Sequence, residues 1–390
     1  MAEELIKVGI IGTGNCGGQL VDLAVTHGFS GIAVNASQKD LNLLTSNVLC
    51  FTVGDGKGTG KNREEAKKFF DSHITILKDD NFIKFINNCD VIVIATSTGG
   101  GFGSGASLAL TESLIGIYPD KAFIPAGVLP FDEEGYTAQT HTIEWLQELS
   151  ELGVPYMLYD NNRFAGKPQK EVCEIVNEQF VSDLMVIRGD YINETRLGGV
   201  DERDMLTTLS TPGRIVIDSI DEIEEADIID NSIVKTIKEH IKNESAHSDM
   251  VEDKEIRASV MMYTLSSTFD PYKGSIKADV QDTFGEHISD YSNYTDIDDD
   301  SEEEVEESAA LILAGLSEPA MRIDKVINRQ KKLEDDILGR KKVKSKLGKT
   351  KIGNDALKLN AKSFATGVTP SKRNIDEVLR KHSSSEESSK

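Results

Sequence analysis

The sequence has no apolar run that approaches the ~20 residues a membrane-spanning helix needs. Its first residues, MAEELIK, are acidic and lead directly into an apolar run, so we expect no signal peptide. The four cysteines, Cys16, Cys50, Cys89 and Cys173, form no CxxC pair and have no histidine-rich neighbourhood. This scatter disfavours a disulfide framework or a zinc site and favours reduced thiols. We therefore expect a cytoplasmic protein that does not contact a membrane.

Positive charge is scarce except near the end of the sequence. The 390 residues carry a net charge of −23, yet residues 340–381 hold 13 Lys and Arg against 3 Asp and Glu. The net charge of that segment is +10. Because residues 382–390 carry −1, residues 1–339 carry a net charge of −32. A basic segment on an acidic body is the part expected to meet acidic partners. The run 296–307, with 9 Asp or Glu among 12 residues, is too charged to bury and predicts a solvated insert.

Glycine is concentrated between a strand and a helix. Val91–Ala95 is a continuous apolar run, typical of a strand buried on both faces of a parallel sheet. Five glycines follow within residues 99–105, and Ala106–Gly116 reads as a helix. Glycines permit positive φ and close backbone approach, and backbone N–H groups at the start of a helix bind anions. The context predicts a phosphate-binding loop rather than a flexible linker.

Two further glycine-rich loops follow predicted strands. Gly12-Thr-Gly-Asn-Cys-Gly17 after Lys7–Ile11 fits the GxGxxG pattern of a dinucleotide-binding unit. The next strand, Gly31–Val34, ends at Asn35 rather than at the acidic residue that would hold a ribose, which weakens a dehydrogenase interpretation. The third loop, Gly54–Asn62, carries lysines but does not satisfy the Walker A spacing; its alternative is a surface loop.

The segment GGGFGSG resembles the GGGTGTG or GGGTGSG signature of the tubulin/FtsZ superfamily, with Phe102 in place of Thr. Other motifs of that family follow in the same order: PF-x-x-EG ending at Gly135, an Asn-Asn-Arg turn, a helical Asn, and two aspartates three residues apart. The turn, the long C-terminal helix and the basic tail favour the prokaryotic plasmid and phage branch (TubZ-like and PhuZ-like proteins). The family's usual Arg and its base-stacking aromatic fall here on Ala138 and Cys173.

The resemblance implies that GTP and Mg²⁺ are bound. Glu134 would contact the ribose, and Asn161 and Asn177 would contact guanine. Asp201 and Asp204 would activate water on the GTP of a neighbouring subunit, with N-terminal helix capping as their alternative role. The full set of implied nucleotide-binding residues is Gly12, Thr13, Gly14, Asn15, Cys16, Asn35, Gly58, Thr59, Gly99, Gly100, Gly101, Phe102, Gly103, Ser104, Gly105, Glu134, Asn161 and Asn177.

The expected fold is α/β, with a parallel Rossmann-like nucleotide-binding sheet and flanking helices. The expected division is a GTP-binding domain at 1–167, a long central helix at 168–190, and a catalytic loop with a smaller α+β activation domain at 191–318. A C-terminal helix at 319–346 and a basic, largely disordered tail at 347–390 complete the chain.

The implied function is polymerisation into longitudinal filaments, with GTP hydrolysed at subunit interfaces, to segregate or position plasmid or phage DNA. The tail would bind a DNA-bound adaptor protein or DNA itself, because cations pair with phosphates. Three alternatives stay open: an FtsZ-like division filament, an NAD(P)-binding oxidoreductase, and a nucleotide-dependent scaffold that does not hydrolyse.

Overall fold

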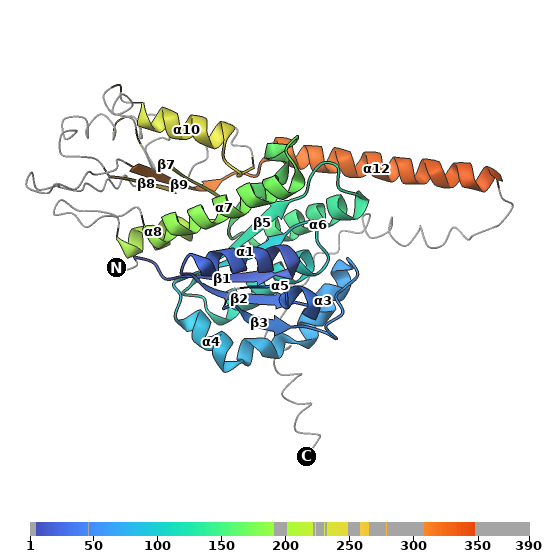
Figure 1. Cartoon of the computed structure of the whole chain (residues 1–390), viewed down its shortest axis with the longest axis horizontal. Coiled ribbons are helices and arrows are strands. Elements are labelled where there is room, and N and C mark those ends of the chain that lie inside the picture. The colour runs from blue at the N-terminus through green and yellow to red at the C-terminus, as the bar shows by residue number, and fades with distance from the viewer. Residues whose placement is uncertain are drawn as a thin grey trace, which may run out of the picture. The chain divides into compact units, whose positions relative to one another are not determined.

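A computed structural model describes residues 5–45, 47–190, 201–220, 223, 230, 232–248, 258–264, 278 and 308–347. Two compact units divide the chain, Met1–Gln330 and Lys331–Lys390, and the sheet and the sites below lie in the first. Among the described residues, nine strands form one sheet in the order β3-β2-β1-β4-β5-β6-β7-β9-β8 (Figure 1). The expected α/β sheet is therefore confirmed.

The strands are β1 (Val8–Thr13), β2 (Ser30–Asn35), β3 (Leu49–Thr52), β4 (Val91–Ser97), β5 (Ala122–Leu129), β6 (Pro155–Asp160), β7 (Gly213–Ile220), β8 (Ala258–Thr264) and β9 (Ser308–Leu316). The helices are α1 (Gly14–Thr26), α2 (Gln38–Leu41), α3 (Arg63–Ser72), η1 (Ile74–Lys78), α4 (Asp80–Asn87), α5 (Phe102–Ile117), α6 (Tyr136–Leu152), η2 (Asn161–Phe164), α7 (Gln169–Arg188), α8 (Glu202–Leu209), α10 (Ile233–Asn243) and α12 (Ala320–Leu347).

Seven strands, from β3 to β7 in the sheet order, run parallel to one another. Their central members are buried along nearly their whole length, because helices cover both faces. β9 pairs antiparallel with β7, and β8 pairs antiparallel with β9. The strands expected in a second domain thus continue the same sheet; the predicted division of the chain into domains stays a prediction.

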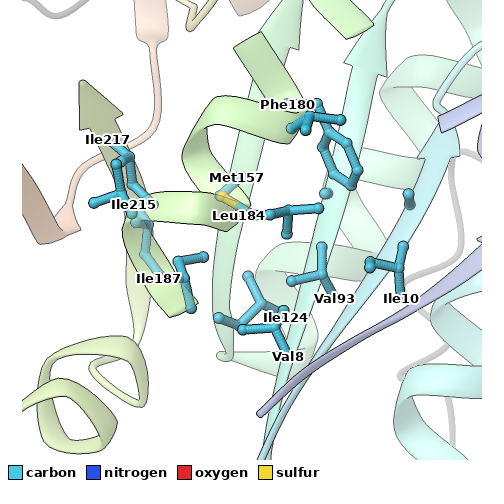
Figure 2. Packing of buried hydrophobic residues seen from close by; sticks show 14 of the residues in the cluster. Val8, Ile10, Val93, Ile124, Met157, Phe180, Leu184, Ile187, Ile215 and Ile217 are labelled. Carbon is cyan, nitrogen blue, oxygen red and sulfur yellow. The ribbon is translucent and has the colours of Figure 1, made fainter. Parts of the chain in front are cut away.

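One face of the sheet packs against α1 and α7. Side chains alternate along a strand, so Val8 and Ile10 of β1 and Val93 of β4 lie on this face. Figure 2 shows these residues opposite Phe180 and Leu184 of α7. All five side chains are essentially excluded from solvent, and each contributes roughly 1.5–3 kcal/mol through burial. α7 is therefore held firmly along the sheet.

The opposite face packs against α5 and α6. Trp145 of α6 is fully buried among Leu108 of α5 and Leu129 and Leu158 of the sheet. Its indole N–H donates to the Ser107 hydroxyl at 3.0 Å, so the buried polar atom has a partner.

The predicted elements before residue 190 agree with the structure in type and approximate position, except that α1 and α5 begin earlier than expected. The acidic insert at 296–307, residues 191–200 and all but Leu347 of the tail at 347–390 lie outside the described residues. In the described part of the chain, no helix has the length and apolar character to cross a membrane.

Candidate nucleotide-binding site

The first two glycine loops lie at the point where the strand order changes direction. β2 and β3 lie to one side of the β1–β4 pair, and β5 and β6 lie to the other. Ligands of open parallel sheets bind outside the carboxyl ends of the strands at such a point. α1 begins directly after β1, and α5 begins shortly after β4; neither has an acidic residue in its first turn. Two helix N-termini thus offer N–H groups to an anion at one place.

The second loop is shorter than predicted, because α5 begins at Phe102 rather than at Ala106. Gly103, Ser104 and Gly105 belong to its first turn and are buried. The Ser104 hydroxyl donates to the carbonyl of Gly100. Because glycine has a poor intrinsic helix propensity, the sequence predicted a loop over these residues. Packing against neighbouring segments overrides that preference.

Close packing, not positive φ, explains the glycines of the second loop. None of the glycines from 99 to 105 has a positive φ, so that part of the sequence-based explanation is wrong. A Cβ on Gly103 would lie 2.4 Å from the Thr96 hydroxyl and 2.7 Å from the carbonyl oxygen of Thr13. A Cβ on Gly101 would lie 2.5 Å from Cα of Lys61. The three glycine loops therefore meet at distances that exclude a side chain.

The third loop is the one that needs unusual backbone angles. Every glycine from Gly54 to Gly60 has a φ between 56° and 86°, and Lys61 has a φ of 63°. A lysine in this region is strained by about 1–3 kcal/mol. This strained conformation places the backbone of Lys61 against Gly101 of the second loop. Sequence reasoning missed Lys61, because a positive φ at a residue other than glycine has no local sequence signal.

Arg63 fixes the third loop to the second. Its side chain is 3% exposed and donates to the carbonyl of Ser104 at 3.1 Å. The same guanidinium binds both carboxylate oxygens of Glu148 on α6, at 2.6 and 2.7 Å. Burial acts to raise the pKa of Glu148, but Arg63 and Lys67 hold it below its ordinary value. No local motif singles out Arg63, since its partner is 85 residues away.

Asn35 shapes a turn in the structure. Its side chain is buried, accepts from the backbone N–H of Ser37 at 3.2 Å and donates to Asp40 at 3.4 Å. The predicted phosphate-loop residues Thr13 and Thr59 are also buried, whereas Asn15 is exposed. In the first loop, the Asn15 side chain is thus exposed to solvent, whereas Thr13 is buried.

Glu134, Cys16 and Cys173 come together from three separate segments. Burial, with smaller contributions from the neighbouring Cys173 and Glu134, raises the pKa of Cys16 to about 12. Burial also raises the pKa of Glu134, which accepts from the N–H of Phe131 at 3.1 Å. The predicted ribose residue therefore lies beside the first glycine loop and the start of α7.

Asn161 and Asn177 are half-buried, and neither side chain hydrogen-bonds to another described residue. Asn161 begins η2, directly after β6, while Asn177 lies on α7 one turn beyond Cys173. An amide offers both a donor and an acceptor, as the mixed edge of guanine requires. A hollow of about 380 Å³ opens beside these turns, lined by Phe131, Glu133, Glu134, Ala165, Gly166, Lys167 and Gln169.

Asp201 and Asp204 lie elsewhere. They form a capping box at the start of α8: Asp201 accepts from the N–H of Asp204 at 2.9 Å, and Asp204 accepts from the N–H of Asp201 at 3.3 Å. Asp201 is exposed and borders an open hollow of about 850 Å³ along α8. The capping role is therefore confirmed, and it can coexist with a catalytic role, which stays a prediction. Within one molecule, these carboxylates are not among the residues gathered at the glycine loops.

α7 separates the two sets of residues. It begins near Cys173 and Glu134, and its last carbonyl, on Arg188, accepts from the N–H of Ile6 just before β1. Its 20 residues span about 30 Å at 1.5 Å per residue. α8 ends shortly before Gly213, which pairs with the first residue of β6. α8, whose N-cap is Asp201, thus lies on the amino-end side of the sheet, opposite the glycine loops. Figure 1 shows α8 beside one end of α7.

The acidic side chains of the site determine how it could hold Mg²⁺. Among the described residues, no three His, Cys, Asp or Glu side chains gather as metal ligands. Mg²⁺ usually keeps several waters and is bound through phosphates with one or two carboxylates. The residues present therefore fit a metal ion that is held chiefly by the phosphates of a nucleotide.

A parallel sheet with glycine loops at its switch point defines a nucleotide-binding protein. Residues 7–167 match the family model described as "Tubulin/FtsZ family, GTPase domain". The match confirms the resemblance of these residues to the tubulin/FtsZ GTPase domain and disfavours the NAD(P) oxidoreductase.

The curated relatives include proteins from archaea and from a phage. The tubulin-like protein CetZ of Pyrococcus abyssi is 27% identical over 222 residues, which cover 54% of this chain and 56% of CetZ. The tubulin-like protein TubZ of a Clostridium botulinum C phage is 25% identical over 237 residues, covering 58% and 63%. The chain spans about half the length of the curated relatives it matches.

The fold is shared over more of the chain. The protofilament structure of Bacillus thuringiensis serovar israelensis TubZ in its GTPγS form aligns with a TM-score of 0.67 at 18% identity. The alignment covers 87% of this chain and 95% of that protein. The similarity therefore extends beyond residue 167, where the family model ends.

Proposed function

We propose that this protein binds and hydrolyses GTP and assembles head to tail into cytoplasmic filaments, with each active site completed by a neighbouring molecule. One observation carries the proposal: the glycine loops and the Asp201–Asp204 pair lie toward opposite ends of α7, a helix whose 20 residues span about 30 Å. Carboxylates at that distance cannot touch a water molecule at the γ-phosphate within one molecule. A second molecule stacked along the same axis would supply them, and the TubZ neighbour is described as a protofilament.

The residues toward the two ends of α7 would have different roles in GTP hydrolysis. The N–H groups of the glycine loops bind the phosphates, Glu134 accepts from a ribose hydroxyl, and Asn161 and Asn177 pair with guanine. A Mg²⁺ ion held chiefly by those phosphates would supply charge neutralisation there. Asp201 and Asp204 of the neighbour orient the attacking water and accept its proton. Positioning and electrostatics supply most of the rate in phosphoryl transfer, so a site completed by assembly hydrolyses only after assembly.

GTP turnover per molecule is expected to depend on protein concentration. It should be near zero below a critical concentration and rise steeply above it, because only assembled molecules have complete sites. The measurement is steady-state phosphate release over a dilution series, with pelleting at each concentration and ATP in place of GTP as the control. Constant turnover per molecule down to dilutions that leave no pellet would mean that each molecule has a complete site.

We also propose that the filament segregates or positions plasmid or phage DNA, which places the protein in the plasmid and phage branch. The support is the similarity to TubZ of a phage and the basic segment 340–381. Thirteen cations in that segment can pair with an acidic surface of a DNA-bound adaptor protein or with DNA phosphates. The acidic body, at −32, disfavours DNA along the filament itself.

Truncation after Gly339 is expected to leave GTP hydrolysis and pelleting within about twofold of the full chain, because the described site lies before residue 330. Association with the DNA–adaptor complex should be lost, since the truncation removes the cations that bind it. Co-pelleting with labelled DNA, with and without adaptor, measures this. Cargo that still co-pellets without the segment would refute the recruitment role, leaving a solubilising extension.

A further inference from the structure

Arg322 is a buried arginine in the first turn of α12 that no sequence motif had singled out. Its side chain is 2% exposed. Its Nε donates to Asp160 at 2.7 Å, one terminal nitrogen donates to Asp132 at 2.7 Å, and the other donates to the carbonyl of Pro130 at 2.7 Å. Pro130 and Asp132 belong to the turn after β5, and Asp160 ends β6 and caps the turn that follows it. All three directions of the guanidinium are therefore used to join those turns.

Asn162 closes the arrangement into a ring. Its side-chain amide donates to the second oxygen of Asp132 at 3.0 Å, and its backbone N–H donates to the second oxygen of Asp160 at 3.0 Å. Its side-chain oxygen accepts from the N–H of Asp132 at 3.3 Å. Arg322, Asp132, Asn162 and Asp160 thus form one closed hydrogen-bonded ring, in which every carboxylate oxygen has a partner.

The ring lies beside both residues expected to read the nucleoside. Glu134 follows Asp132 by two positions in the turn after β5, and Asn161 stands between Asp160 and Asn162 in the turn after β6. Neither Glu134 nor Asn161 is a member of the ring. The ring instead fixes the separation and orientation of the two backbone turns that carry them.

Arginine suits this role better than lysine. Its planar fork donates in several fixed directions at once, whereas a lysine ammonium is a single point charge on a flexible stem. Without the guanidinium fork, Asp160, which is 3% exposed, and Asp132 would lose the group that binds both of them at fixed positions. The two turns would then separate or take up water, and the nucleoside contacts would lose their fixed spacing.

We propose that Arg322 is a positioning residue for the nucleoside: through it, the first turn of α12 sets the spacing of the ribose-binding and base-binding turns. This rests on the proposed GTP binding. A preorganised spacing favours guanine over other bases, because a hydrogen bond is strong only within a narrow range of distance and angle. Arg322 touches neither the phosphates nor the water-activating aspartates, so it acts on binding and base selectivity.

The test measures GTP and ATP affinity for the full chain below its assembly concentration, using a fluorescent GTP analogue with unlabelled ATP as competitor. Arg322→Lys is expected to weaken GTP binding about tenfold, the scale of one hydrogen bond to a charged group. The preference for GTP over ATP should fall with it. Turnover at saturating GTP in assembled protein should stay within about twofold of the wild type, so that KM changes and kcat does not.

Arg214→Lys is the matched control. Arg214 is equally buried at 2%, and it donates to the carbonyls of Ser317 and Ser248 rather than to either nucleoside turn. Both variants should lower the unfolding temperature, but only Arg322→Lys should change base selectivity. Asn162→Ala breaks the ring without removing a buried charge and should give the same loss of selectivity, which covers the case that Arg322→Lys does not fold.

The proposal would be overturned if folded Arg322→Lys or Asn162→Ala had the GTP affinity of the wild type and the same preference for GTP over ATP. An equal loss of affinity in Arg214→Lys would also overturn it, since Arg322 would then be a general stabiliser. If the wild type itself binds no GTP, the proposed function fails instead.

Discussion

Asp204→Asn is expected to reduce GTP turnover by about 10²–10⁴-fold, the range that general acid–base groups contribute. GTP binding and assembly should persist, because the glycine loops that hold the phosphates are unchanged. The resulting filaments should persist as well, since they retain the γ-phosphate. Asp201→Asn should behave in the same way. The measurements are phosphate release, nucleotide affinity and the lifetime of pelletable polymer after dilution.

Asparagine separates the catalytic role from the capping role. Asn caps a helix as well as Asp does, so these variants should keep the start of α8 and their stability. Alanine would remove the cap and cost about 1 kcal/mol. Glu202→Ala is the control, because Glu202 is an exposed acidic residue in the same turn but lies outside the capping box. Turnover that survives in Asp201→Asn and Asp204→Asn would leave capping as the only role of these residues.

Gly103→Ala is expected to abolish nucleotide binding at concentrations that saturate the wild type. The added methyl group would lie 2.4 Å from the Thr96 hydroxyl and 2.7 Å from the Thr13 carbonyl. Atoms cannot remain at those distances, so β1, β4 and the start of α5 must shift apart. Overpacking of this kind costs about 1–3 kcal/mol, which a domain with ordinary stability survives. The N–H groups would no longer converge on one phosphate chain.

Gly100→Ala is the matched control within the same loop. Its added methyl group would lie 3.4 Å from the nearest atom, the Ser97 hydroxyl, which is close to an ordinary contact. We expect the unfolding temperature of Gly100→Ala to stay near the wild-type value, whereas that of Gly103→Ala should fall by several degrees. Equal unfolding temperatures for the two variants would show that the loops adapt, contrary to this explanation.

The fold could be predicted in large part because strands and glycine loops alternate regularly. Continuous apolar runs such as Val91–Ala95 end at glycines, and both signals are local in sequence. The reason for the glycines could not be predicted. Close approach at Gly103 and positive φ at Gly54 both require glycine, and only the neighbouring backbone distinguishes the two causes.

The site was predicted where its residues belong to local motifs and was missed where they do not. Glu134 and Asn161 lie in short patterns that the family resemblance identifies. Arg322 meets Asp160 across 162 residues, and Arg63 meets Glu148 across 85. The sequence does not distinguish a buried arginine from an exposed one. Only the tertiary fold determines which carboxylates an arginine contacts.

In the proposed filament, the aspartates of one molecule complete the pocket of another. The most direct measurement is GTP turnover in an equimolar mixture of Asp204→Asn, which keeps the pocket, and Gly103→Ala, which keeps the aspartates. Co-pelleting of the two variants, one of them labelled, verifies that they share a polymer. We expect each variant alone to be inactive and the mixture to hydrolyse GTP, because the mixed contact unites an intact pocket with intact aspartates. A co-pelleting mixture that is no more active than the sum of its parts would contradict the account.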